Sequence, residues 1–234
     1  MRRVVYLPGI AGNPARSPAL EILAADGWDI VVPDLPGFDG RPGFQPPDDY
    51  LGWLTVVWDA LDATEALPCP VVGASVGGML GADVAALRPE AVTALALLAP
   101  FGIFDPDHPG LDLYAVPTAD RMSHLFAKGV PDPFADRFGE LGPDEGPVAR
   151  YLSDVAAASL LWPVGDRGLA SRLHRITGPT LVMWGDQDEL LPVGASAAWA
   201  GLAPVEVVTG AGHLLEWDTP EEVGRRVAAF LGDL

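Results

Sequence analysis

A serine flanked by glycines is the feature that most constrains how this chain folds. Residues 73–77 have the sequence GASVG, directly after an apolar run at 69–72 and just before a run of helix-forming residues at 79–87. The first run predicts a short buried strand, and the second predicts a helix. Ser75 is therefore expected on a sharp turn from strand to helix, where small neighbours allow strained backbone angles. Such a turn exposes the serine oxygen and aims the following backbone amides at one point.

The composition predicts one folded domain with a strongly acidic surface. The chain has 234 residues, 49% of them apolar, and no low-complexity tract, so it can bury a sizeable core. It carries 14 basic and 32 acidic residues, a formal net charge of −18. Such a surface repels the phosphates of nucleic acids and anionic lipids, so neither nucleic acid nor a membrane is expected as a partner. The expected partner is a small-molecule substrate, and the oligomeric state stays open.

The cysteine content and the N-terminal residues bear on metal binding and location. Cys69 is the only cysteine, so it cannot form an intramolecular disulfide, and its setting predicts a small core residue. Two arginines at 2–3 are followed by only four apolar residues, too few for a signal peptide, and no run reaches membrane-spanning length. We therefore expect a cytoplasmic protein. The chain has no HExxH motif and no cysteine pair, so no metal and no cofactor is expected.

Apolar runs alternate with amphipathic segments along most of the chain. Helices are expected at 18–26, 50–67, 79–87, about 194–200, and 220–231, and strands at 4–7, 29–32, 69–72, 92–98, 180–184 and 205–208. The run at 92–98 is almost continuously apolar, which is typical of a strand buried on both faces. This alternation predicts an α/β fold with a mostly parallel, doubly wound sheet.

The alternation is interrupted once, between residues 101 and 176. Proline, glycine and aspartate there separate short clusters of apolar residues. We interpret residues 101–176 as a mainly helical cap laid over the sheet. The core of the fold would then consist of residues 1–100 and 177–234.

Ser75 becomes a good nucleophile only if a neighbouring base accepts its proton and a carboxylate orients that base. His213 lies in a glycine-rich loop directly after the strand expected at 205–208. A side chain there projects from the carboxyl end of a strand, where ligands bind in open parallel sheets. The other histidines, His108, His124 and His174, lack such a position, although His124 in the expected cap could line a pocket.

The carboxylate has two candidates, Asp186 and Asp188, which directly follow the strand expected at 180–184. Aspartates in a turn are often merely solvated, so position alone does not choose between them. The chain order serine, aspartate, histidine is that of enzymes whose nucleophile lies on a strand-to-helix turn. It differs from the orders in chymotrypsin and subtilisin.

Three motifs of this chain resemble those of one known superfamily. Residues 184–192, WGDQDELLP, are similar to the acid motif W-G-x-x-D-x-x-x-P, residues 212–213 match its G-H, and residues 73–78 match its G-x-S-x-G-G. On these motifs the chain resembles the α/β-hydrolase superfamily with a cap domain, over about residues 4–231. The resemblance implies the α/β-hydrolase type of sheet and a serine-dependent reaction.

The resemblance also implies which side chains form the catalytic triad. Its acid motif places the carboxylate at Asp188 rather than Asp186, beside Ser75 and His213. The other acid position used in the family would fall near residues 99–102, where this chain has no carboxylate. The triad implied by the resemblance is Ser75, Asp188 and His213.

By the same resemblance, the backbone amides of Ile10 and Val76 form the oxyanion hole. Each such donor lowers the barrier by about 3 kcal/mol. The chain departs from the family at residues 8–9, which are Pro-Gly where His-Gly is usual. Backbone amides can still bind the oxyanion, but the local support of that loop differs.

Three further acidic residues are candidates for supporting roles. Asp34 lies in a loop similar to the D-x-x-G loop of the family, whose acidic residue is generally structural. Glu216 and Asp218 closely follow His213 in the chain. They could tune the histidine, or they could be surface residues.

The activity expected first is hydrolysis of a small, largely apolar carboxylic ester through an acyl-enzyme. The apolar and aromatic content of the cap predicts a mostly apolar pocket above the serine. Packing of the cap onto the sheet would account for any single one of these side chains equally well. The candidate lining residues are Phe101, Phe104, Leu125, Phe126, Leu161 and Trp162.

Other activities stay open at this level. Residues 161–176 look similar to capped hydrolases that include the carbon–carbon bond hydrolases of aromatic-ring degradation, which use the same triad on a vinylogous diketone. Those enzymes commonly have a tryptophan after the catalytic histidine, where this chain has Leu214, so ester hydrolysis ranks first. A ligand-binding protein that keeps the fold without catalysis is a further alternative. Perhydrolysis or acyl transfer would use the same residues as hydrolysis.

Overall fold

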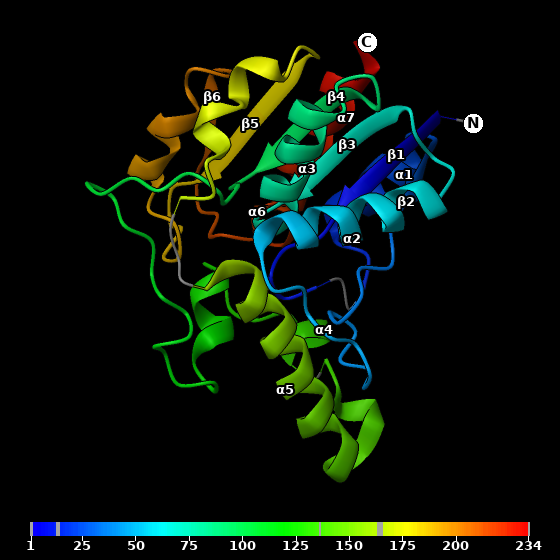
Figure 1. Ribbon diagram of the computed structural model, residues 1–234. Helices are drawn as coiled ribbons and strands as arrows, with labels where there is room; N and C mark the ends of the chain where they lie inside the picture. The colour runs from blue at the N-terminus through cyan, green and yellow to red at the C-terminus, as the bar shows by residue number, and fades with distance from the viewer. Residues whose placement is uncertain (1, 13–14, 136, 163–165, 234) are drawn as a thin grey trace.

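The computed structural model describes residues 2–12, 15–135, 137–162 and 166–233. Residues 13 and 14 of the loop after the first strand, and residue 163 of the segment similar to capped hydrolases, lie outside these ranges. The described strands form one sheet in the order β2-β1-β3-β4-β5-β6, with every pairing parallel (Figure 1). Their bounds are β1 Arg2–Leu7, β2 Trp28–Val31, β3 Cys69–Ala74, β4 Val92–Leu98, β5 Thr180–Gly185 and β6 Val205–Val208.

Helices cover both faces of this sheet, so the expected doubly wound α/β fold is confirmed. Helix α1 (Pro18–Ala25) packs with α7 (Pro220–Gly232) on one face, and α2 (Tyr50–Ala63) packs with α3 (Val76–Leu87) on the other (Figure 1). The helix expected at 194–200 is instead a run of 3₁₀ turns, η5 (Val193–Trp199).

The strand order reverses between β1 and β3, and this reversal positions the candidate site. From β1 the chain first moves outward to β2 and then returns to add β3 on the other side of β1. Leu7 pairs with Gly73 at the carboxyl ends of these two strands. The loop that follows β1 therefore begins beside the turn that carries Ser75. Open parallel sheets bind ligands at such a point of reversal.

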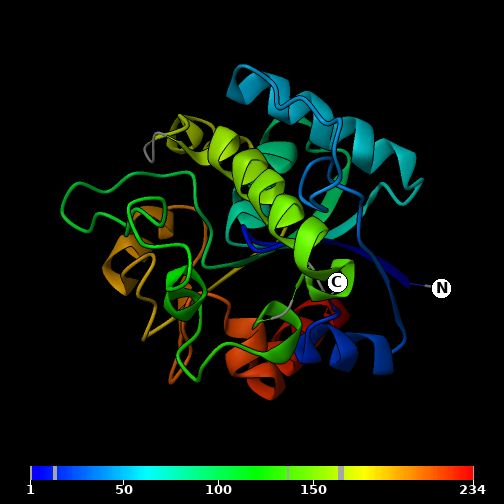
Figure 2. The same ribbon diagram turned by 90° about the horizontal axis from the view of Figure 1, so that it is seen from below.

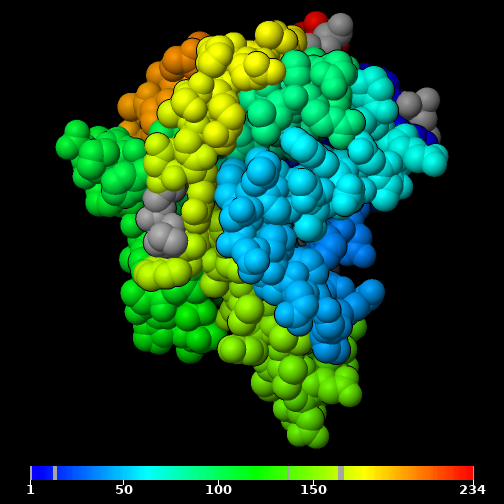
Figure 3. All heavy atoms as spheres, viewed as in Figure 1, coloured from blue at the N-terminus to red at the C-terminus, as the bar shows by residue number. Residues whose placement is uncertain are grey.

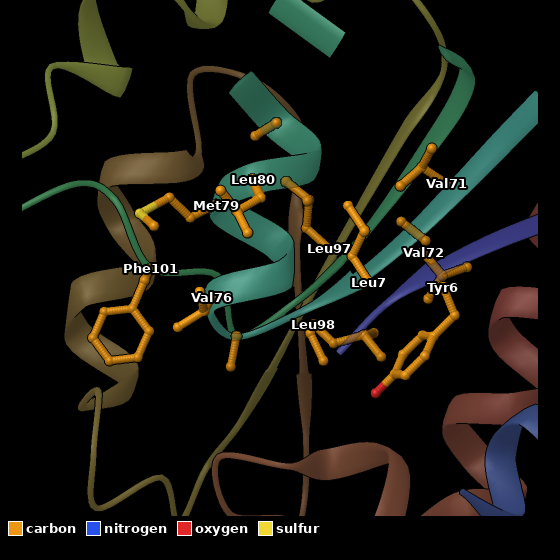
Figure 4. Packing of buried hydrophobic residues seen from close by; sticks show 14 of the residues in the cluster. Tyr6, Leu7, Val71, Val72, Val76, Met79, Leu80, Leu97, Leu98 and Phe101 are labelled. Carbon is orange, nitrogen blue, oxygen red and sulfur yellow. The ribbon is translucent and has the colours of Figure 1, made fainter. Parts of the chain in front are cut away.

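Helix α3 is buried on nearly all sides, which explains why its sequence is apolar throughout. Figure 4 shows Val76, Met79 and Leu80 of this helix against side chains of the central strands, among them Leu7 and Leu97. The 3₁₀ turns η3 (Leu169–Ser171) and η4 (Leu173–Arg175) contact the helix as well. Burial of this kind anchors the start of α3, and with it the position of Ser75, to the core. Cys69 is buried, as expected for a core residue.

We refer to residues 99–179, which join β4 to β5, as the connection. Its one long helix is α5 (Gly142–Leu161), and its shorter elements are α4 (Asp132–Ala135), η1 (Arg121–Leu125), η2 (Gly139–Leu141), η3 and η4. Residues 101–120 form turns and bends, because prolines and glycines recur there. Helix is therefore concentrated in α5, which crosses below the carboxyl ends of the strands (Figures 1 and 2).

The start of β1 and the end of α7 lie at the opposite end of the molecule from α5 (Figure 1). In the space-filling view, the N-terminal end of α5 and the turn before it project furthest from the sheet (Figure 3). None of the described helices combines the length and the apolar character needed to cross a bilayer.

Candidate active site

Ser75 lies between the end of β3 and the start of α3, in a strained backbone conformation. Its φ is 56° and its ψ is −121°, a region that residues with side chains rarely occupy and that costs about 1–3 kcal/mol. Neighbouring backbone groups hold it there. The Ser75 amide donates to the carbonyl oxygen of Leu98 at 2.8 Å, and its own carbonyl oxygen accepts from Phe101 at 3.1 Å and from Met79 at 3.2 Å.

A continuous chain of hydrogen bonds joins Ser75 to a histidine and an aspartate. The Oγ atom of Ser75 lies 2.7 Å from Nε2 of His213, and Nδ1 of His213 lies 2.8 Å from Oδ2 of Asp188. A carboxylate only accepts hydrogen bonds, so Nδ1 carries the proton and Nε2 accepts from the serine hydroxyl. Ser75 and His213 are fully buried.

The other oxygen of Asp188 is also fixed. Oδ1 accepts hydrogen bonds from the backbone amides of Leu190 at 2.9 Å and Leu191 at 2.8 Å. These bonds orient the carboxylate so that Oδ2 faces the histidine. Asp186, in contrast, is exposed and accepts from the amide of Gly210 at 2.7 Å. The structure therefore brings Asp188, and not Asp186, to His213.

The remaining histidines all lie in the connection and take no part in the hydrogen-bond chain of Ser75. Nδ1 of His108 lies 2.9 Å from Oδ2 of Asp105, and Nδ1 of His124 lies 2.8 Å from Oε2 of Glu189. His174 lies in the 3₁₀ turn η4. Among the residues that the structure describes, no group of three or more histidine, cysteine or acidic side chains could hold a metal ion.

The loop after β1 approaches Ser75 closely, because it has glycine at residue 9. A Cβ atom at Gly9 would lie 3.0 Å from Cβ of Ser75 and 3.1 Å from Cδ2 of Leu214. The next residue, Ile10, and the residue after the serine, Val76, are both buried. No described group accepts a hydrogen bond from either of their backbone amides. Both amides thus keep a free donor near the serine turn.

The six expected lining residues occupy different environments. The ring of Phe101 packs edge-on against His213, with centroids 5.5 Å apart. Leu125, Phe126 and Leu161 are buried, and Leu125 accepts a hydrogen bond from the Leu214 amide at 2.9 Å. Phe104 and Trp162 are 47% and 55% exposed. Phe101 is the one that touches the histidine by a ring contact.

Two pockets lie next to this site, and neither is lined by Ser75 or by those six side chains. The larger is an open groove of about 980 Å³ between residues 32–42 and the start of α5, and it reaches Pro8 and Gly12. The smaller, which we call the inner pocket, has about 40 Å³ and is lined by Ile10 and Ala11 together with residues of the connection. The inner pocket is the one whose lining includes Ile10, the residue predicted to supply an oxyanion-hole amide. Because Ser75 is completely covered, a substrate reaches it only if the covering segments move.

Charged side chains are present in the otherwise mostly apolar lining of the inner pocket. Arg121, Arg137, Arg150 and Asp154 contribute to it. Sequence reasoning missed these residues, since single arginines on a long helical segment are typical of a solvated face. A signal that could have drawn attention to these arginines was the scarcity of basic residues, of which the whole chain has 14.

Asp218 is buried and ties the loop of His213 to the connection. Its Oδ2 accepts from the amides of Gly212 and Ala127, both at 2.8 Å, and its Oδ1 accepts from the amide of Lys128 at 3.2 Å. A carboxylate that accepts several backbone N–H groups fixes the segments that supply them. Of the two roles that the sequence left open, a surface position is thus excluded for Asp218.

Glu216 is buried too, on the side of the loop that faces β1. Its Oε1 accepts a hydrogen bond from the Tyr6 hydroxyl at 3.0 Å, while its Oε2 has no partner among the described residues. Burial raises the pKa of Glu216 to about 7, although the Tyr6 hydrogen bond and the nearby His213 act in the opposite direction. Burial and the Glu216 charge together raise the pKa of Tyr6.

Glu216→Gln should flatten the pH dependence of stability between about pH 5 and about pH 8. The folded chain holds the Glu216 proton more tightly than the unfolded chain, where the ordinary value is 4.5. The stability from this proton is fully present below pH 4.5 and is lost as pH rises through about 7. At about 1.4 kcal/mol per pH unit, the loss is roughly 3 kcal/mol. Urea unfolding at both pH values measures it.

The matched control for this experiment is Glu222→Gln, since Glu222 is exposed in the first turn of α7. It should follow the wild-type curve. If Glu216→Gln lost as much stability as the wild type between the two pH values, the assignment of the buried proton to Glu216 would be wrong.

A parallel, doubly wound sheet with a serine on the turn after β3 is the architecture of α/β hydrolases. The model of the alpha/beta hydrolase family matches residues 4–226. The chain belongs to this family, and the protein is a hydrolase.

Named relatives include hydrolases of two kinds. The chain is 27% identical to the 2-hydroxymuconate semialdehyde hydrolase of Pseudomonas putida, over 98% of this chain and 86% of that protein. It is also 27% identical to the pimeloyl-[acyl-carrier protein] methyl ester esterase of Neisseria meningitidis, over 70% of this chain and 55% of that protein. It spans 41% of a third relative, the biotin biosynthesis bifunctional protein BioHC of Teredinibacter turnerae, with 27% identity over 92% of this chain.

Solved structures share the fold over the whole chain. One is a bacterial membrane phospholipase A, with a TM-score of 0.78 and 23% identity, over 99% of this chain and 79% of that one. At this identity the likeness extends to the fold alone.

Proposed function

We propose that this protein is a serine hydrolase that cleaves a small carboxylic ester through Ser75, His213 and Asp188. The observation that supports it most is the hydrogen-bond chain from the Ser75 hydroxyl through His213 to Asp188, at 2.7 Å and 2.8 Å. Three side chains distant in sequence meet there in the geometry of a charge-stabilised general base. No metal or cofactor takes part in the proposed reaction.

The proposed reaction proceeds in two halves. His213 takes the proton of Ser75 as the serine oxygen bonds to the ester carbonyl carbon, and the oxyanion accepts hydrogen bonds from the amides of Ile10 and Val76. His213 then gives its proton to the departing alcohol, which leaves an acyl-enzyme. Water attacks the acyl carbon with His213 again as base, and release of the acid restores Ser75. Asp188 holds the imidazole tautomer and stabilises its charged form throughout.

We propose that residues 101–176 act as the cap of this enzyme, and residues 1–100 and 177–234 as its core. Two contacts link this cap to the loop of His213. In one, the amides of residues 127 and 128 donate to the Asp218 carboxylate, and in the other the Leu214 amide donates to the Leu125 carbonyl. Movement of the cap would therefore shift the loop that carries the catalytic histidine.

Carbon–carbon bond hydrolysis is the second candidate, and the name of the Pseudomonas putida relative favours it. The name of the Neisseria meningitidis relative favours an ester. We rank the ester first, because this chain has Leu214 at the position after His213. A ligand-binding protein without catalysis is a third candidate, and the intact hydrogen-bond chain argues against it.

The proposal is tested by labelling the protein with a fluorophosphonate and by comparing two substrates. We expect one covalent adduct, on the Ser75 peptide in mass spectrometry, and loss of p-nitrophenyl ester turnover after labelling. The rate on short p-nitrophenyl esters should exceed the rate on a diketone ring-fission product. Faster cleavage of the diketone would favour the second candidate. An unlabelled protein with no turnover of either substrate would favour the third.

A further inference from the structure

The inner pocket has an excess of positive charge in a strongly acidic protein. Its charged lining residues are Arg121, Arg137 and Arg150 against Asp154. The chain as a whole has 14 basic residues and a formal net charge of −18. Three of those 14 side chains thus surround one pocket of about 40 Å³, which has room for a group of a few atoms.

One arginine of the three is neutralised by the protein itself. Nη1 of Arg121 lies 3.1 Å from Oδ2 of Asp154, and its Nε donates to the Val116 carbonyl at 3.1 Å. For Arg137 and Arg150, no carboxylate of the described residues lies within 4.0 Å. The positive charge of the pocket therefore belongs to these two guanidinium groups.

These two guanidinium groups, for which no described carboxylate is a partner, lie against the same aromatic ring. The Cζ atoms of Arg137 and Arg150 are 4.7 Å and 6.0 Å from the centroid of Phe138. Arg137 also donates to the carbonyl oxygen of Phe38. A guanidinium has five N–H donors, so most of those on Arg137 remain unused by the described residues. The shared ring holds the two planar groups in place beside the pocket.

Like charge and burial make this arrangement unfavourable without an anion. Burial lowers the pKa of Arg137 to about 10; the charge of Asp154 opposes this shift and the neighbouring Arg150 adds to it. Burial raises the pKa of the one acidic group, Asp154, although the charges of Arg121, Arg150 and Arg137 lower it, so this single carboxylate is shared among three guanidinium groups. A carboxylate between the two guanidinium groups would offset their repulsion and accept several of the free N–H donors.

The pocket is continuous with the proposed oxyanion loop. Ile10 and Ala11 form its wall, and Ile10 follows Gly9, which approaches Cβ of Ser75. The side chain of Arg137 packs against the same loop, since a Cβ atom at Gly12 would lie 2.9 Å from the Cζ atom of Arg137. A group bound in the inner pocket would therefore belong to a molecule that extends to the serine.

We propose that Arg137 and Arg150 form a carboxylate subsite, so that the substrate is an ester carrying a second, free carboxylate. The inference rests on the proposed function of the site and refines the class of substrate. The acidic groove outside, with Glu140, Asp144 and Glu145 on its wall, repels anions at long range. Attraction in the partly buried pocket dominates at contact distance, because the local dielectric constant is lower there.

The first test compares matched charged and neutral esters. Monomethyl adipate and methyl hexanoate carry the charge difference on the acyl side, and 4-acetoxybutanoate and butyl acetate carry it on the alcohol side. For at least one pair, kcat/KM for the charged ester should exceed that for the neutral ester about tenfold or more, as expected for charge-assisted hydrogen bonds. A ratio of one or less in both pairs would overturn the proposal.

The second test uses variants of Arg150, which has no hydrogen bond to a described residue that its loss would break. Arg150→Gln should lower the charged-to-neutral ratio of kcat/KM about tenfold, because the charged ester loses a charge-assisted hydrogen bond that the neutral ester never makes. Arg150→Lys keeps the charge without the planar fork and should give an intermediate ratio. The control is Arg225→Gln, at an exposed position of α7, which should keep the wild-type charged-to-neutral ratio. An equal fall on both esters in Arg150→Gln would show a structural role only.

A binding measurement separates this inference from the proposed function. Calorimetry with the Ser75→Ala protein should detect adipate but not adipamide, and Arg150→Gln in that background should weaken adipate binding about tenfold or more. Arg150-dependent adipate binding without any esterase activity would keep the subsite and reject the function. Ester hydrolysis with no adipate binding and no charge preference would keep the function and reject the subsite.

Discussion

Ser75→Ala should abolish ester hydrolysis by this protein, with a fall in kcat on the order of 10⁶-fold. The proposed reaction forms its covalent bond through the serine oxygen, and alanine leaves His213 with no nucleophile to activate. Ser75 and His213 are buried and 2.7 Å apart, so no other hydroxyl of the described residues takes the place of the lost one at Nε2. The measurement is the steady-state rate on p-nitrophenyl acetate and butyrate.

The control for this prediction is Ser171→Ala. The hydroxyl of Ser171 is exposed and bonds the carbonyl of Gly168 within η3, so its removal should leave the rate unchanged. Circular dichroism should give the same spectrum for both variants and the wild type. Retention of even a tenth of the activity in Ser75→Ala would reject Ser75 as the nucleophile.

Gly77→Ala should destabilise the fold by about 4 kcal/mol or more, enough to unfold a domain of ordinary stability. A Cβ at residue 77 would overlap the carbonyl oxygen of Leu7 and lie 2.6 Å from the carbonyl oxygen of Pro8. Both atoms belong to the backbone at the end of β1, so no side-chain rotation relieves the clash. The measurement is the yield of folded protein and its midpoint of urea unfolding.

Gly232→Ala is the matched control, because a Cβ at this last residue of α7 meets no atom within 4 Å. Alanine in a helix should leave stability unchanged or raise it by about 0.5–1 kcal/mol. If Gly77→Ala unfolded at the same urea concentration as the wild type, the close approach of α3 to β1 would be wrong.

The strands were predictable, because each is a short apolar run bounded by turn residues, and their alternation with helices predicted a parallel sheet. The pattern between residues 92 and 98 predicted a strand buried on both faces, and β4 is almost entirely buried. Local sequence patterns did not predict the type of helix correctly where that type depends on packing against other segments. Residues 193–199 form 3₁₀ turns rather than an α-helix. The helix of the connection is concentrated in α5, between stretches that prolines and glycines interrupt.

For the candidate site, position after the expected strands selected Ser75 and His213 and left Asp186 and Asp188 as candidates, and the resemblance to the family's acid motif then implied Asp188. The structure then brings these three together and turns Asp186 toward Gly210 instead. Residues that share a strand-to-loop position at one edge of a parallel sheet are predictable in this way, because the sheet aligns the carboxyl ends of its strands.

The sequence by itself determined the class of fold, because that depends on local pattern, and it placed Ser75, His213 and two aspartates directly after strands. The choice of Asp188 between the two aspartates came from the resemblance to the family's acid motif. Only the tertiary structure decided that Glu216 and Asp218 are buried, and that Arg137 and Arg150 share one ring beside the oxyanion loop. Burial and charge balance depend on which distant segments cover a residue. Such contacts leave no periodic trace in the sequence, so they had to be found in three dimensions.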